Sequence, residues 1–127
     1  MSSFSDYVAG LTHVLNQIDT SAFEAVVDTL RETHDRDAVI FICGNGGSAA
    51  TASHMVNDLV KAPADASGCR PFRAISLTDC VPLMTALAND IDYSQAMARQ
   101  LHALGRPGDI VVAICGSGNS PNVLEAV

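Results

Sequence analysis

Two short glycine- and serine-rich runs carry residue types suited to holding an anion. Gly44-Asn45-Gly46-Gly47-Ser48 and Cys115-Gly116-Ser117-Gly118-Asn119-Ser120 each follow an apolar segment and precede a helical pattern. Glycines let the backbone approach a ligand closely and adopt positive φ. The first amides of a helix have no partner within it and attract negative charge. The two runs therefore predict an anion site, although tight turns with serine caps would give the same pattern.

A second pair of reactive groups follows the first of these runs. His54 and Asp58 stand four residues apart in a segment, 49–61, that has the pattern of a helix. This spacing places them on one side of the helix, about 40° apart around its axis. An imidazole and a carboxylate placed in this way could share a divalent metal or act as acid and base. A simple His–Asp hydrogen bond on the helix surface is the alternative.

Two further patterns leave their chemistry open. Asn89-Asp90 could contact sugar hydroxyls, or it could only end the short helix predicted over 82–88. Gly44-x-Gly46-x-x-Ala49 resembles a dinucleotide fingerprint, with Asp79 as its acidic residue. However, Asp79 lies 35 positions after Gly44, whereas that fingerprint places its acid about 20 residues on.

The elements that must position these groups alternate along the chain. Apolar strand-like runs over 38–43, 73–77 and 109–114 are separated by helical patterns, and a loop is predicted over 63–71. Such alternation predicts a parallel sheet with helices on both faces, and the continuous apolar run over 38–43 predicts a strand buried on both sides. Because sheets of this class usually have five or six strands, we expect a longer domain with roughly two more strand–helix units after Val127.

The first 37 residues have a different pattern. Apolar residues recur at helical spacing between Ser3 and Ile18, and Ser3 with Asp6 has the form of a capping box. A second helix is predicted to begin at Ser21. We therefore expect residues 1–37 to form a helical hairpin, the N-terminal arm, that serves packing or oligomerisation.

Composition limits the class of protein. The chain has 127 residues, 48% of them hydrophobic, with 7 basic and 14 acidic side chains, a formal charge of −7. With no cluster of Lys or Arg, a nucleic-acid partner is not expected, and no apolar run has the roughly 18 residues that a membrane span needs. The polar N-terminus lacks the pattern of a signal peptide. The four cysteines form no CxxC pair, so we expect reduced thiols in the cytoplasm.

Three runs together resemble one known family. GNGGSAATASHMVNDL, ALANDIDYSQAMARQL and GDIVVAICGSGNSPNVLEAV occur in the order found in the sugar-isomerase (SIS) domain, and most resemble its branch acting on sedoheptulose 7-phosphate. The resemblance implies a flavodoxin-like, doubly wound parallel sheet and a homotetramer with active sites between subunits. It also implies conversion of this ketose phosphate into an aldose heptose phosphate for bacterial heptose synthesis. The reaction would pass through an enediol, with a carboxylate base, a histidine acid and zinc.

The resemblance also assigns roles to residues. His54 matches a metal-ligand histidine, and Asp58 falls where the family has a glutamate that is both metal ligand and base. Cys115 and Gly116 take the place of a Ser-Thr pair in the phosphate-binding turn. The remaining substrate-binding positions are matched by Asn45, Gly46, Gly47, Ser48, Asn89, Asp90, Ser117, Asn119 and Ser120.

These departures from the family pattern leave two hypotheses. Asp58 is one methylene shorter than glutamate, Cys115-Gly116 removes two hydroxyls, and the family's C-terminal Gln and His would lie beyond Val127. The leading hypothesis is a sugar-phosphate isomerase with an oligomerisation arm over 1–37 and an SIS sugar-phosphate-binding domain over 38–127, incomplete at its C-terminal end. The alternative is a non-catalytic SIS protein that binds a sugar phosphate or a protein partner, such as a replication initiator.

Overall fold

The computed structural model of the chain describes residues 3–65 and 68–127. The chain divides into two compact units, one ending at Arg31 and the other running from Glu32 to Val127. The candidate site residues all belong to the second unit. Among the described residues, none of the helices combines the length and apolarity that crossing a membrane requires.

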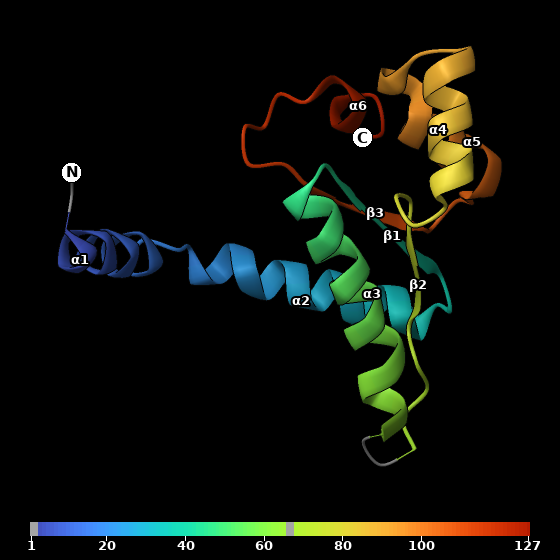
Figure 1. The fold of residues 1–127 in the computed structure, drawn as a ribbon. Helices are drawn as coiled ribbons and strands as arrows, with labels where there is room; N and C mark the ends of the chain where they lie inside the picture. Colours follow the sequence, from blue (N-terminus) through green and yellow to red (C-terminus); the bar gives the residue numbers. More distant parts are fainter. Residues whose placement is uncertain (1–2, 66–67) are drawn as a thin grey trace. The chain divides into compact units, whose positions relative to one another are not determined.

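A three-stranded sheet forms the centre of the second unit (Figure 1). The strands are β1 (Val39–Gly44), β2 (Arg73–Ser76) and β3 (Ile110–Ile114), in the order β2-β1-β3. Both pairings are parallel, with Ile40 of β1 opposite Ala74 and Ile110. This confirms the predicted parallel sheet, and its strand order is that of flavodoxin-like folds.

Helices cover β1 on both faces because its side chains alternate between them. Helix α3 (Gly47–Asp65) packs along β1 and β2. On the other side, Phe41 and Cys43 belong to a core shared with α4 (Val81–Asp90), α5 (Ala96–Leu104) and α6 (Pro121–Leu124), and the short helix η1 (Tyr93–Gln95) lies between α4 and α5 in the chain. The buried members of that core are Phe41, Cys43, Leu77, Met84, Ala96, Met97 and Val123.

The outer strand β3 is less buried than the central strand β1. Its residues alternate between half-buried and exposed, and Val111 is 36% exposed. Val111 lies opposite Phe41 in the register and so faces the same side of the sheet. The helices that bury Phe41 therefore do not extend over β3.

The N-terminal unit contains α1 (Phe4–Leu15) and most of α2 (Thr20–Asp35). The predicted capping box is present, since Ser3 Oγ accepts from the Asp6 amide and Asp6 accepts from the Ser3 amide. Helix α2 begins one residue earlier than predicted. Its cap is Asp19, whose Oδ1 accepts from the amides of Ser21 and Ala22 at 2.9 and 3.3 Å.

Two helices extend further than their sequences predict. Helix α4 keeps Asn89 and Asp90 in its last turn, so this pair does not break the helix. Helix α3 continues to Asp65, past Pro63, and residues 66–67 of the predicted loop lie outside the described residues. Proline cannot donate to the carbonyl four residues earlier. That carbonyl, of Leu59, accepts instead from the Phe72 amide at 3.2 Å, which offsets the loss.

Gly44 marks the closest approach between β1, β3 and the start of α3. A Cβ atom there would lie 2.7 Å from Ser48 Cβ and 2.8 Å from the Ile114 carbonyl oxygen. We expect Gly44→Ala to lower the free energy of unfolding by about 2–3 kcal/mol, in the range of overpacked cores. Gly47→Ala is the control, because a Cβ there meets no described atom within 4 Å. Urea unfolding would measure both, and equal stabilities would contradict the close approach.

Candidate functional site

Both glycine- and serine-rich turns lie at the carboxyl edge of the sheet, because β1 and β3 are parallel neighbours. Gly44, where the first turn begins, is opposite Ile114, which precedes the second. Gly46 and Gly118 have φ values of 53° and 69°, a region that glycine occupies without strain. In open α/β sheets, ligands bind outside this edge of the strands.

A hydrogen-bonded group of three side chains joins the first turn to η1 and to α6, the helix that follows the second turn. The Asn45 amide nitrogen donates to Asn122 Oδ1 at 2.9 Å, and the Asn122 nitrogen donates to Asn45 Oδ1 at 2.7 Å. The Tyr93 hydroxyl also donates to Asn45 Oδ1, at 2.8 Å. Asn122, in α6, is only 2% exposed. Asn45 is therefore held by residues from two other elements.

A cavity of about 350 Å³ lies beside this group. Its walls carry amide, hydroxyl and carboxylate groups, which suit a ligand with several hydroxyls. The sequence analysis identified only Asn45 and Ser120 among its lining residues. The lining is formed by Asn45, Asp92, Tyr93, Ser94, Ser120, Pro121 and Asn122.

The second turn surrounds a thiol with hydroxyls. Cys115 Sγ lies 3.3 Å from Ser120 Oγ and 3.5 Å from Ser117 Oγ. Hydrogen bonding with Ser120 and then with Ser117 lowers the pKa of Cys115 to about 6. Ser117 Oγ also accepts from the Asn119 amide at 3.2 Å. Ser120 stands at the N-cap of α6 as predicted, but its side chain makes no capping bond.

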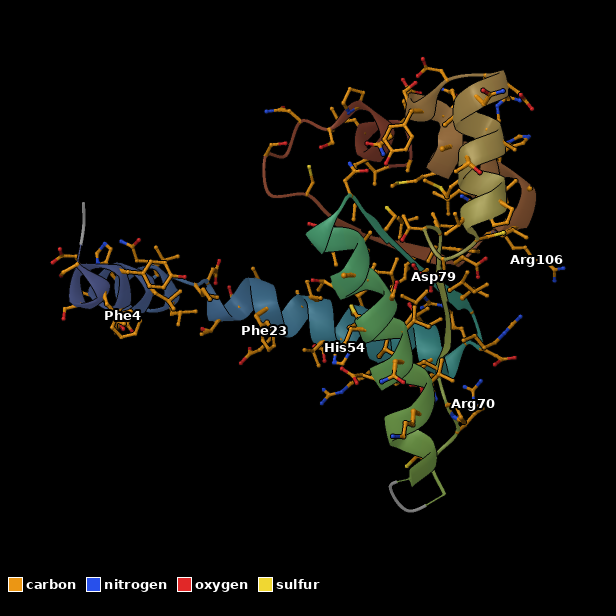
Figure 2. The ribbon with its side chains drawn as sticks, in the orientation of Figure 1. Phe4, Phe23, His54, Arg70, Asp79 and Arg106 are labelled. Carbon is orange, nitrogen blue, oxygen red and sulfur yellow. The ribbon has the colours of Figure 1, made fainter. Side chains whose placement is uncertain are left out.

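His54 and Asp58 lie on α3, as the spacing predicts, and His54 is labelled in Figure 2. His54 Nε2 is 3.6 Å from Asp58 Oδ2, and the two side chains are 76% and 61% exposed. Nitrogen and carboxylate oxygen are both zinc ligands, but a catalytic zinc usually has three protein ligands. Among the described residues, no three His, Cys, Asp or Glu side chains gather closely enough to hold a metal. His54 and Asp58 therefore fit as two of the protein ligands of a zinc ion, and do not form a complete zinc site by themselves.

Asn89 and Asp90 lie in the last turn of α4, and both are exposed. The hydrogen bond between them joins Asn89 Nδ2 to Asp90 Oδ1 at 2.8 Å. The cavity is lined instead by Asp92, Tyr93 and Ser94, which follow them in the chain. The sequence motif therefore lies just before the residues that line the cavity, and its contact with a ligand stays a prediction.

Asp79 holds α3 against the end of β2 (Figure 2). Its Oδ1 accepts from the Ser76 hydroxyl at 3.0 Å and from the hydroxyl of Ser53, the residue before His54. The dinucleotide alternative would have used this carboxylate for a ribose. Sequence reasoning missed the Ser53 partner, which lies 26 residues away and carries no motif.

Comparison with known proteins decides the family. The sequence model described as the SIS domain matches residues 3–127. The chain belongs to the SIS domain family. This confirms the resemblance seen in the three sequence runs.

Relatives within the SIS family include phosphoheptose isomerases. That of Chlorobaculum parvum is 35% identical over 121 residues, covering 95% of this chain and 58% of the relative. That of Desulfovibrio desulfuricans is 49% identical over 97 residues, covering 72% and 43%. The chain therefore spans about half the length of the curated relatives it matches.

The fold of this chain also matches solved structures of phosphoheptose isomerases. The phosphoheptose isomerase of Neisseria gonorrhoeae matches with a TM-score of 0.80 and 31% identity, covering 97% of this chain and 62% of that one. The Francisella tularensis phosphoheptose isomerase gives a TM-score of 0.84 and 27% identity, with coverages of 99% and 68%. The likeness thus includes nearly the whole of this chain.

The lowered pKa of Cys115 predicts its reactivity. Because the thiolate is the nucleophile, its rate of alkylation by iodoacetamide should rise with pH, pass its midpoint near pH 6 and then level off. Burial raises the pKa of the Cys43 thiol, so Cys43 should stay unmodified throughout. Mass spectrometry of digested protein would follow each site. A Cys115 midpoint at pH 8 or above would contradict the hydrogen-bonded thiolate.

Proposed function

We propose that this chain acts as a sugar-phosphate isomerase that converts sedoheptulose 7-phosphate into D-glycero-D-manno-heptose 7-phosphate. The observation that carries the proposal is the pair of glycine- and serine-rich turns at one edge of an SIS-family sheet, with Asn45 of the first turn hydrogen-bonded to Asn122 of α6, the helix that follows the second turn. The relatives named phosphoheptose isomerase supply the substrate. Ser48, Ser117 and Ser120 would hold the phosphate with the amides of the turns.

In this proposal, side chains of α3 carry out the proton transfer. His54 and Asp58 lie six and ten positions after Ser48, about 9 and 15 Å along the helix, so a ligand held at the turns must extend along α3. Asp58 would take a proton from C1, and the C–H electrons would form the C1=C2 bond of the enediol as the C2 oxygen gains a proton. Return of a proton to C2, with loss of one from the C1 oxygen, gives the aldose. His54 would orient Asp58 through their contact.

We extend the proposal to zinc. His54 and Asp58 would be two of its ligands, and the others would come from outside the described residues. When bound, zinc would act as a Lewis acid on the substrate carbonyl. Equilibrium dialysis tests this without activity: His54→Ala should lose bound zinc, whereas His13→Ala, on the N-terminal arm, should keep it.

We also propose that the chain self-associates as a homotetramer through its N-terminal arm and works in the cytoplasm. Helix α1 has no buried residue, although its apolar side chains share one face. An exposed apolar face of this kind is typical of an interface. Cys43, Cys80 and Cys115 are free thiols, which fits a reducing compartment.

An NMR time course with sedoheptulose 7-phosphate tests the proposed reaction. The protein would be assayed with and without added zinc, after its oligomeric state has been measured. New aldose signals that depend on the protein support the proposal. Absence of conversion by zinc-loaded, associated protein would contradict it.

One observation favours a second candidate function, a non-catalytic SIS protein that binds a sugar phosphate or a protein partner. His54 and Asp58 form an exposed pair on one helix, with no third metal-ligating side chain beside them among the described residues. Such a protein would bind sedoheptulose 7-phosphate without converting it. Titration calorimetry beside the NMR time course separates the two functions.

A further inference from the structure

Tyr93 is the least expected member of the group around Asn45. It lies in η1, 48 residues from Asn45 along the chain, yet its hydroxyl reaches Asn45 Oδ1 at 2.8 Å and its ring lines the cavity. The proposed phosphate-binding serines do not require it. Its side chain is 50% exposed, so packing alone does not account for its contact with Asn45.

The hydrogen bonds of Asn45 determine what it can offer a ligand. A side-chain amide has two acceptor lone pairs and two N–H donors. Tyr93 and Asn122 fill both lone pairs of Asn45 Oδ1, and Asn122 Oδ1 takes one of the two donors. A single N–H remains. Asn45 therefore presents a donor, which fits a hydroxyl, carbonyl or phosphate oxygen of the ligand.

Asn122 alone would not fix this orientation. If both amides of the Asn45–Asn122 pair turned over together, their two mutual hydrogen bonds would be kept, because each group exchanges N–H for C=O. Asn45 would then present a carbonyl oxygen to the ligand in place of the N–H. Tyr93 adds a third hydrogen bond that anchors the Asn45 side chain in the orientation seen in the structure, where the hydroxyl donates to Oδ1 and the remaining N–H is left for the ligand.

We propose that Tyr93 is a positioning residue, whose hydroxyl holds the Asn45 amide with one N–H free for an oxygen atom of the sugar phosphate. The inference rests on the proposed sugar-phosphate site. Because this N–H would contact the ligand equally in the ground state and the transition state, loss of its orientation should raise KM and leave kcat nearly unchanged.

Tyr93→Phe tests the proposal because it removes the hydroxyl and keeps the ring. Tyr7→Phe is a matched control, since Tyr7 is the only other tyrosine and lies on α1. KM for sedoheptulose 7-phosphate should rise about three- to tenfold in Tyr93→Phe, the range that one hydrogen bond supplies. It should not change in Tyr7→Phe. An unchanged KM in Tyr93→Phe overturns the proposal, as does a fall in kcat alone.

A second readout does not depend on turnover. In ¹H–¹⁵N spectra, the Asn45 side-chain amide should show one proton protected from solvent exchange, and Tyr93→Phe should reduce that protection and shift the resonance. Titration with inorganic phosphate should show weaker binding by Tyr93→Phe than by Tyr7→Phe. If the wild type converts no substrate, the isomerase proposal fails while these measurements still test Tyr93. An Asn45 resonance and phosphate affinity identical in both variants would overturn the positioning role.

Discussion

Asp58→Asn is expected to abolish isomerase turnover, lowering kcat by about 10²- to 10⁴-fold, the contribution of a positioned general base. The amide has nearly the shape of the carboxylate but cannot accept the C1 proton. Because the turns at the sheet edge are unchanged, KM should remain within about twofold. NMR assays over a range of substrate concentrations would separate the two constants.

Three further variants separate loss of the base from loss of metal. Asp58→Glu keeps the charge and should retain turnover to within about tenfold, because it restores the side chain that the family pattern has at this position. Asp35→Asn, an exposed carboxylate at the end of α2, is the control for removing one negative charge. Excess zinc should partly rescue His54→Ala but not Asp58→Asn. Full activity in Asp58→Asn would remove Asp58 from the proposed mechanism.

The parts of the fold that were predicted correctly depend on local pattern. The apolar run 38–43 predicted the central strand, which spans Val39–Gly44 and is buried on both faces. Ser3 and Asp6 predicted the capping box, which needs only residues within one turn. Glycines and serines after two strands predicted two turns at one edge, because parallel neighbours must end together.

What was missed depends on contacts between distant residues. Tyr93 and Asn122 reach Asn45 across 48 and 77 positions of the chain, and neither belongs to a recognisable motif. Tyr93 and Asn122 reach Asn45 because η1 and α6 pack near the carboxyl end of β1. The exposure of Val111 has the same origin, since the apolar sequence of β3 contains no information about which helices reach it.

Helix ends were predicted less well than helices because their determinants compete. Asn89 and Asp90 favour turns, yet both belong to the last turn of α4. Ile91 caps the helix, and its amide donates to the Leu87 carbonyl. Pro63 should end α3, but Phe72 supplies the donor that Leu59 lacks. In both helices, a hydrogen bond formed by the folded backbone outweighs a local propensity of about 1–3 kcal/mol.

Leu11→Glu is expected to dissociate the proposed oligomer without unfolding the chain. Leu11 lies in the middle of the apolar face of α1 and is 47% exposed. Burying a leucine contributes about 1.5–3 kcal/mol, a two-fold interface contains each residue twice, and a buried unpaired carboxylate costs more. The association constant should therefore fall about 10²-fold or more.

Ala9→Glu is the matched control for this experiment. It introduces the same charge on the same helix, but Ala9 is exposed and lies about 160° around the axis from Leu11. Light scattering after size-exclusion chromatography should show smaller particles for Leu11→Glu only, while circular dichroism stays unchanged in both variants. If both variants keep the wild-type mass, α1 does not form the interface and the arm has another role. If both dissociate, added charge rather than the apolar face is responsible, because only one of the two substitutions removes an apolar contact.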